Sequence, residues 1–200
     1  MGMNRSRDVA ILIFDDVEVL DFCGPFEVFS VAGRGDNLSP FHVYTVAETS
    51  KPVMARNNLS VNPTHTILDC PQPQILLVPG GNGTRREMHN KTLIDWIRDR
   101  SGAADLVLSV CTGALLLAKA GLLEGLAATT HHNAVELLRE VARNTRIEEN
   151  KRVVDNGKII LAAGISAGID MSLYVISKLL GKDQALKTAQ YMEYHWKPES

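Results

Sequence analysis

The sequence has few cysteines and little excess charge. Its 200 residues include three cysteines, none in a C-x-x-C pair, which excludes a disulfide framework or a paired-cysteine zinc site and favours a reducing, cytoplasmic location. The 21 basic and 23 acidic side chains give a net charge of −2, which argues against a protein that holds nucleic acid or an anionic membrane by charge. The uncharged stretch 106–118 is too short to cross a bilayer of about 30 Å. We therefore expect neither a nucleic acid nor a membrane as a partner.

The composition that remains is that of a soluble globular protein. Hydrophobic types make up 45% and charged types 22% of the chain, and no repeat, low-complexity tract or linker divides it. A chain of this length can bury a sizeable core without metal or disulfide staples. We therefore expect one domain over residues 1–200.

Short apolar runs alternate with longer amphipathic ones. Strands are predicted at 9–14, 41–46, 75–78, 106–110, 127–130, 152–154 and 158–161, and a small hairpin at 53–61. Helices are predicted at 20–32, 86–100, 112–120, 134–141, 166–180 and 183–191. The apolar runs are buried on both faces, which indicates a mostly parallel sheet with helices on both sides. The predicted fold class is a three-layer α/β sandwich.

One cysteine stands where a buried strand passes directly into a helix. In Ser109-Val110-Cys111-Thr112-Gly113-Ala114 the chain must turn sharply, and small neighbours permit a nucleophile elbow. The free N–H groups of the helix start should lower the pKa of the Cys111 thiol from about 8.5. The alternative is a small buried apolar residue, which suits Cys23 and Cys70 better.

Three further features fall near the same predicted sheet edge. Gly81, in Pro79-Gly80-Gly81-Asn82-Gly83, can turn its N–H into the crevice, where with the N–H of Thr112 it would stabilise developing negative charge. An ordinary tight turn explains these glycines equally well. Asp21 and Glu18 are competing acids, and either could simply favour the start of a helix. His131 and His132 are adjacent and lack a spaced third partner, so we expect no metal site.

Taken together, these stretches resemble the ThiJ/PfpI superfamily of class I glutamine amidotransferase-like proteins, over 9–193. The matching motifs are Leu20-Asp21 with Gly24-Pro25, Pro79-Gly80-Gly81, Ser109-Val110-Cys111-Thr112-Gly113, Ala128-Thr129-Thr130-His131 and Gly164-Ile165-Ser166-Ala167-Gly168-Ile169-Asp170. The resemblance implies a flavodoxin-like sandwich and a homodimer. It also implies that Asp21 approaches the sulfur of Cys111, with Gly81, Thr112, His131 and Ile165 around the substrate.

Within that superfamily the isonitrile hydratase branch is the most similar. It implies a lyase without cofactor or metal that converts a small isonitrile to an N-substituted formamide, with Cys111, Asp21 and Thr112 as its catalytic residues. Thr112 stands where the peptidase-like branch has a histidine, and His132 stands where hydratases have an aromatic residue. The alternatives are a hydrolase or glyoxalase-like activity on small carbonyl compounds, an amidase-like activity, and a non-enzymatic cysteine redox sensor or regulator-like domain.

Overall fold

A seven-stranded sheet forms the centre of the protein. The structure is a computed structural model that describes residues 6–198. The strands of the central sheet follow the order β10-β11-β7-β6-β1-β2-β5, and β10 alone runs antiparallel to its neighbour. Their bounds are β1 Arg7–Leu12, β2 Phe41–Ala47, β5 His65–Thr66, β6 Ile75–Val78, β7 Leu106–Val110, β10 Val153–Asp155 and β11 Ile159–Ala162. The predicted mostly parallel sheet is confirmed.

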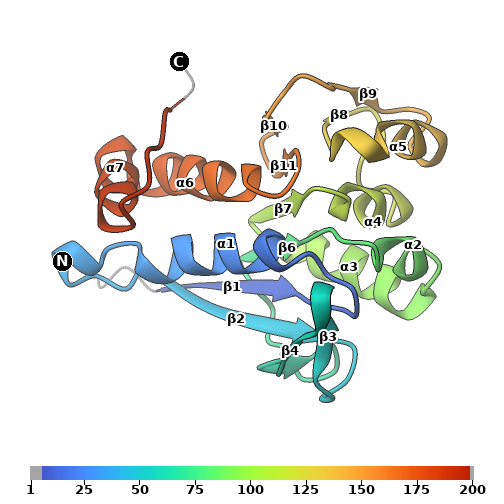
Figure 1. Cartoon of the computed structure of the whole chain (residues 1–200), viewed down its shortest axis with the longest axis horizontal. Coiled ribbons are helices and arrows are strands. Elements are labelled where there is room, and N and C mark those ends of the chain that lie inside the picture. The colour runs from blue at the N-terminus through green and yellow to red at the C-terminus, as the bar shows by residue number, and fades with distance from the viewer. Residues whose placement is uncertain (1–5, 199–200) are drawn as a thin grey trace.

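Helices cover both faces of this sheet. The helices α1, α6 and α7 pack together on one face, and α3 and α4, flanked by α2 and α5, lie on the other (Figure 1). Their bounds are α1 Val19–Val31, α2 Thr84–Glu87, α3 Lys91–Ala103, α4 Gly113–Lys119, α5 Val135–Val141, α6 Ala167–Leu180 and α7 Lys182–Tyr191. Short 3₁₀ turns occur at Arg34–Asp36, Arg56–Asn58 and His132–Ala134. No helix within residues 6–198 has the length and apolar character needed to span a membrane.

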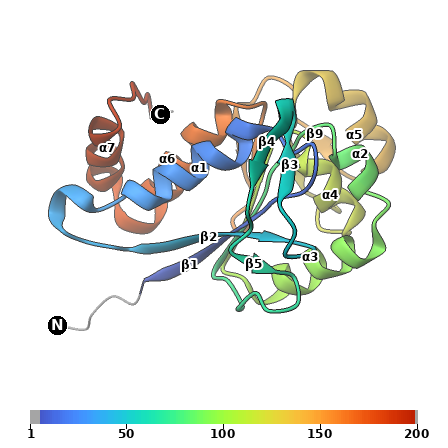
Figure 2. The same ribbon diagram turned by 60° about the horizontal axis from the view of Figure 1, so that its bottom comes forward.

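Two small two-stranded sheets lie outside the central one. The first, β3 Val53–Ala55 with β4 Leu59–Val61, is the predicted hairpin, and it stands beside the end of the main sheet (Figure 2). Asn57 and Asn58 make its turn with φ of 57° and 63°, a left-handed conformation that asparagine tolerates. The second sheet pairs β8 Ala127–Ala128 with β9 Arg146–Ile147. The strands β5 and β9 were not predicted, because two residues are too few to show a period.

One predicted helix was wrong in its extent. The amphipathic stretch 86–100 is divided between α2 and α3, and the break falls at Asn90. The side chain of Asn90 accepts a hydrogen bond from the N–H of Leu93 and so caps the start of α3. Hydrophobic spacing continues across this break, so spacing alone could not show it.

Four adjacent strands bring the candidate residues to one edge of the sheet. The strands β1, β6, β7 and β11 are parallel neighbours, and their central residues are completely buried. Their carboxyl ends therefore meet at the same edge, where α/β proteins bind ligands. The segments that leave these four ends contain Asp21, Gly80-Gly81, Cys111 and Ile165 respectively.

Candidate active site

Cys111 occupies a sharp turn between β7 and α4. Its φ of 56° lies in the left-handed region, which a residue with a side chain adopts only when its surroundings hold it there. Its N–H donates to the carbonyl oxygens of Ala162 and Ala163, at 3.1 and 2.7 Å. Its own carbonyl accepts from the hydroxyl of Thr130 at 2.8 Å. The backbone of the cysteine is thus fixed on both sides, which sets the direction in which its side chain leaves the turn.

Asp21 is the acid that reaches this sulfur. It lies in the first turn of α1 with no exposed surface, and its Oδ2 accepts the N–H of Gly80 at 3.0 Å. The thiol of Cys111 lies near enough to this carboxyl group for each to shift the pKa of the other, while Oδ1 of Asp21 is buried without a hydrogen-bond partner. Glu18, the competing acid, is at the N-cap position of α1 and lies 3.9 Å from Arg56. The structure thus separates two acids that the sequence left equivalent.

Burial shifts the pKa values of both members of this pair upward. The pKa of Asp21 rises to about 7, mainly because its carboxylate would lose its hydration. The pKa of Cys111 rises to about 12, first through burial and then through the negative charge of Asp21. The N–H groups of Thr112 and Ile165 act in the opposite direction and are outweighed. The predicted lowering of the thiol pKa by the helix start is therefore wrong.

The sulfur is also less open than the sequence indicated. Cys111 is only 6% exposed, because residues from α1 and from the turn after β11 pack around it.

The two pKa values determine the resting state of the pair, which above pH 7 is a thiol beside a carboxylate. In this arrangement Asp21 can accept the thiol proton at the moment when the sulfur attacks a substrate, so a free thiolate is not required.

The backbone donors near the sulfur differ from those predicted. The N–H of Gly81 does not face the crevice, since it donates to Oγ1 of Thr112 at 2.9 Å. The Thr112 hydroxyl in turn donates to the carbonyl of Gly81 at 3.1 Å. The N–H groups of Thr112 and Ile165 lie near enough to the sulfur to lower the pKa of its thiol, and Ile165 has a left-handed φ of 50°. Gly81 is therefore corrected from a charge-stabilising donor to a partner of Thr112.

Removing the Thr112 hydroxyl should loosen the glycine turn. Thr112→Val leaves both the N–H and the carbonyl of buried Gly81 without this partner, which should cost about 1–3 kcal/mol of unfolding free energy. Thr112→Ser keeps the hydroxyl and should remain within about 1 kcal/mol of wild type. Urea unfolding of the two variants measures the difference. Equal stabilities would show that the hydroxyl does not hold the turn.

His131 lies beside the turn after β11. A Cβ atom at Gly164 would collide with its ring, so the imidazole rests directly on the backbone next to Ile165. Its Nδ1 accepts from the N–H of Asn133 at 3.2 Å, and burial, followed by the proximity of His132, lowers its pKa. A neutral ring with Nδ1 as acceptor carries its proton on Nε2. The ring of His132 is exposed and stacks on that of His131, with centroids 4.2 Å apart.

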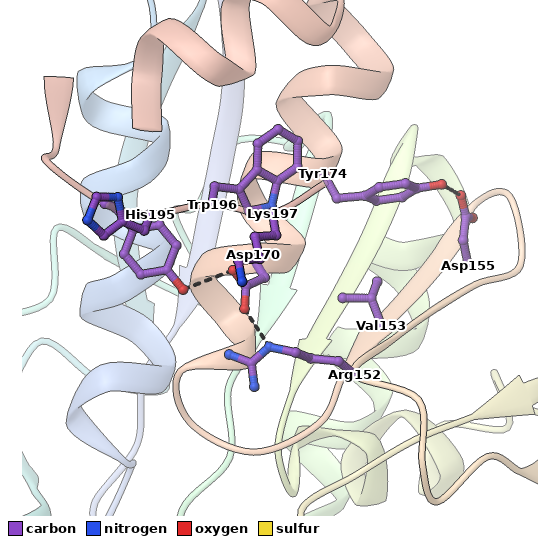
Figure 3. Close-up of a pocket in the computed structure, with 9 residues that line it drawn as sticks. Arg152, Val153, Asp155, Asp170, Tyr174, His195, Trp196 and Lys197 are labelled. Carbon is purple, nitrogen blue, oxygen red and sulfur yellow. Dashed lines mark hydrogen bonds and ion pairs between the residues drawn. The ribbon is translucent and has the colours of Figure 1, made fainter. Parts of the chain in front are cut away.

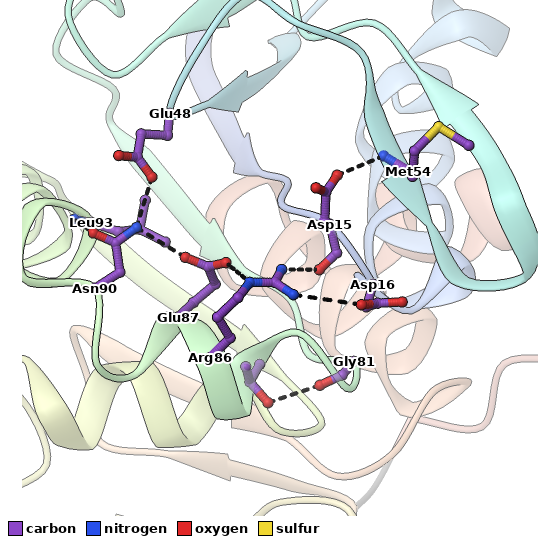
Figure 4. A network of polar contacts seen from close by, with 10 residues as sticks. Asp15, Asp16, Glu48, Met54, Gly81, Arg86, Glu87, Asn90 and Leu93 are labelled. Carbon is purple, nitrogen blue, oxygen red and sulfur yellow. Dashed lines mark hydrogen bonds and ion pairs between the residues drawn. The ribbon is translucent and has the colours of Figure 1, made fainter.

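The loop that leads from β1 to Asp21 is held from the opposite side. Arg86 donates to the carbonyl of Asp15 at 2.8 Å and lies 3.6 Å from the carboxylate of Asp16 (Figure 4). The N–H of Met54 in the hairpin donates to Oδ1 of Asp15 at 2.8 Å. These contacts tie α2 and the hairpin to the loop, so they position α1 and with it the acid.

Sequence reasoning missed the residues that hold the elbow by hydrogen bonds to the backbone of Cys111. No side chain of a catalytic type marks Ala162, Ala163 or Thr130 in the sequence. The sequence likewise gives no indication of the hydrogen bond from Gly80 to Asp21. Their only signal is position, at the ends of strands next to the nucleophile. No cluster of three His, Cys, Asp or Glu side chains within residues 6–198 is arranged to hold a metal ion.

Comparisons with known proteins agree with this geometry. The DJ-1/PfpI family model matches residues 7–178. The chain is 36% identical to isonitrile hydratase of Pseudomonas putida over 94% of its own length and 79% of that protein. It is 29% identical to the HTH-type transcriptional regulator CdhR of Pseudomonas aeruginosa over 92% of its length, which is 54% of that regulator.

Solved structures give the same result for the fold. A ThiJ/PfpI family protein from Pseudomonas syringae superposes with a TM-score of 0.87 at 30% identity, over 98% of this chain and 78% of that one. DJ-1beta of Drosophila melanogaster superposes with a TM-score of 0.82 at 18% identity, over 96% of this chain and all of that one. With the family model covering most of the chain, the protein belongs to the DJ-1/PfpI family.

Proposed function

We propose that this protein hydrates isonitriles to N-substituted formamides. The observation that carries the proposal is the pairing of the Cys111 thiol with the buried Asp21 carboxyl group. An isonitrile, R–N≡C, has an electrophilic terminal carbon and no leaving group, so its hydration needs a nucleophile and a group that moves protons. A thiol beside a carboxylate supplies both. The similarity to isonitrile hydratase supports this substrate class.

The first half of the reaction adds the thiol across the terminal carbon. The sulfur of Cys111 forms a bond to that carbon while Asp21 accepts the thiol proton. Asp21 then passes the same proton to the carbon, which gives the thioimidate R–N=CH–S. The N–H groups of Thr112 and Ile165, which lie near the sulfur, offset developing negative charge. The charge of the site is unchanged over this half.

The second half adds water and releases the sulfur. Asp21, again a carboxylate, takes a proton from water as the oxygen attacks the thioimidate carbon, and the nitrogen receives that proton. The carbon–sulfur bond then breaks, its electron pair returns to the sulfur, and the remaining hydroxyl proton restores the thiol through Asp21. The product is R–NH–CHO. One isonitrile and one water give one formamide, with no oxidant or reductant.

A ligand-sensing domain is the second candidate. The similarity to CdhR extends over 92% of this chain, so the same fold also occurs within a transcriptional regulator. In that case the site would bind a small molecule without turning it over. A peroxide-sensing role is less well supported, because peroxide reacts with the thiolate, and the pKa of Cys111 is raised to about 12.

The test is production of formamide from an added isonitrile. We expect wild-type protein with an alkyl or aryl isonitrile to yield the N-substituted formamide, detected by the formyl proton in NMR, and Cys111→Ala to yield none. Wild type no faster than Cys111→Ala would overturn the proposal. Saturable isonitrile binding without product would instead favour the sensing domain.

The activity should rise with pH through about 7. The attacking form needs Asp21 as a carboxylate, and its pKa is raised to about 7, so the productive fraction grows as the pH passes this value. We expect kcat/KM to increase about tenfold per pH unit below 7 and to level off above it. Initial rates between pH 5 and 9 measure this. A profile that is flat below pH 7 would show that a different group accepts the proton.

A further inference from the structure

A cavity lies away from Cys111. It has a volume of 470 Å³ and is bounded by β10, the first half of α6 and the segment that follows α7 (Figure 3). The residues that line it are Arg152, Val153, Asp155, Asp170, Tyr174, Tyr194, His195, Trp196 and Lys197. This volume is within the range of small-molecule sites in proteins, about 300–1,000 Å³. Neither Cys111 nor Asp21 lines it, so the cavity is separate from the proposed hydratase site.

The two acids of the cavity are already occupied. Asp170 accepts from Nε of Arg152 through one oxygen and from the Tyr194 hydroxyl through the other, the latter at 2.9 Å. Asp155 accepts from the Tyr174 hydroxyl at 2.6 Å and from the ammonium of Lys178 at 2.7 Å. A cationic ligand would have to displace these internal partners. The cavity is therefore poorly suited to an amine.

Positive groups remain available. Arg152 uses Nε toward Asp170 and Nη2 toward the hydroxyl of Ser166, at 3.0 Å for the latter, which leaves Nη1 for a ligand. Lys197 adds an ammonium that has no acidic partner in the part of the chain that the structure describes. Two cations with free donors and two acids without free acceptors favour an anion, and a guanidinium matches a carboxylate well.

The rest of the wall is aromatic and apolar. Tyr174, Tyr194 and Trp196 contribute three rings, and Val153 lies between Arg152 and Tyr174 (Figure 3). Aromatic faces bind planar rings by stacking or edge-to-face contact. We propose that this cavity binds a small aromatic carboxylate, with its ring against Tyr174 and Trp196 and its carboxylate at Arg152 and Lys197.

The test compares three probes by isothermal titration calorimetry. Benzoate has both features, benzamide keeps the ring without the charge, and cyclohexanecarboxylate keeps the charge without the aromatic ring. We expect benzoate to bind and the other two to bind about tenfold more weakly. Cys111→Ala should bind benzoate as well as wild type, so the result does not depend on the proposed hydratase activity.

Variants of the wall identify the site. Trp196→Leu and Lys197→Gln should each weaken benzoate binding about tenfold, while Trp196→Phe and Lys197→Arg should stay within about threefold. Lys91→Gln removes an exposed lysine on α3 and serves as the control for loss of charge. Arg152 is left intact because it also holds Ser166, the residue after Ile165.

Several outcomes would overturn the proposal. The first is that wild-type protein does not bind benzoate at the highest soluble concentration. The second is that benzamide binds as tightly as benzoate. The third is that Trp196→Leu and Lys197→Gln both bind benzoate as tightly as wild type. Loss of benzoate binding in Cys111→Ala would also overturn the proposal, since it would show that benzoate binds at Cys111 and not in this cavity.

Discussion

Replacing Asp21 with asparagine is expected to stabilise the folded protein by about 2 kcal/mol above pH 8. The pKa of this carboxyl group is about 7 in the folded protein, against 3.8 for the free side chain. Each unit of difference corresponds to about 1.4 kcal/mol. The asparagine side chain would have no charge to bury, and its oxygen can still accept the N–H of Gly80. The variant thus keeps this hydrogen bond and avoids the cost of burying a charge. Its NH2 group, however, takes the place of Oδ1, which has no partner in the structure, and an unpaired buried donor offsets about 1–3 kcal/mol of the gain.

The sign of this effect determines its pH dependence. A raised pKa means that the folded state binds the proton more tightly than the unfolded state. The contribution of Asp21 to stability is therefore full below pH 3.8, is lost as the pH rises from there through about 7, and is constant above that. The gain in unfolding free energy from Asp21→Asn should therefore be smallest below pH 3.8, rise with pH through about 7, and be constant above that. Urea unfolding at pH 5 and pH 8 measures it, and an equal gain at both values would contradict the argument.

The same substitution should damage the proposed reaction. An amide cannot accept the thiol proton, so we expect formamide production to fall about 10²–10⁴-fold. The thiol should titrate at lower pH, because the charge of Asp21 is one cause of its raised pKa, and the ultraviolet absorbance of the thiolate measures this titration. Glu18→Gln is the matched control, since it removes the neighbouring acid three residues earlier and should leave both properties near wild type. A thiol that titrates at higher pH in Asp21→Asn than in wild type would contradict this account of its pKa.

The arrangement of the site could largely be read from the sequence, because it follows from where strands end. The buried runs 75–78 and 106–110 predict their strands without error in the bounds, and parallel strands bring their carboxyl ends to one edge. Cys111 directly after the second of these runs could only occupy a tight turn. Asp21 needed the family resemblance, because a carboxylate near a helix start has an ordinary explanation as well.

The electrostatics of the site could not be read in this way. The pKa of Cys111 depends on how much water reaches the sulfur and on the charge of Asp21, and both are set by packing between α1 and the elbow. The direction of the Gly81 N–H depends on a hydrogen bond to Thr112, thirty-one residues later. Local sequence predicts the conformation that a glycine permits, but it does not predict which partner the N–H selects.

The glycine after the elbow provides the sharpest test of the close packing between α4 and β6. A Cβ atom at Gly113 would collide with the carbonyl oxygen of Val78 and lie 2.9 Å from its carbon, and both belong to backbone that cannot rotate away. Gly113→Ala must therefore push α4 away from the end of β6. We expect a loss of about 3 kcal/mol of unfolding free energy, the upper part of the range for overpacking.

Gly102 offers the matched comparison, because it lies in α3 and a Cβ there would meet no atom within 4 Å. Gly102→Ala should stabilise the protein by about 0.5–1 kcal/mol, since alanine has the higher helix propensity. Urea unfolding of the two variants should thus give changes of opposite sign for the same chemical substitution. Because Cys111 is two residues before Gly113, formamide production should fall in Gly113→Ala and stay unchanged in Gly102→Ala. A Gly113→Ala variant as stable as wild type would mean that the turn can relax, and the fixed direction of the Cys111 side chain would then lose its structural basis.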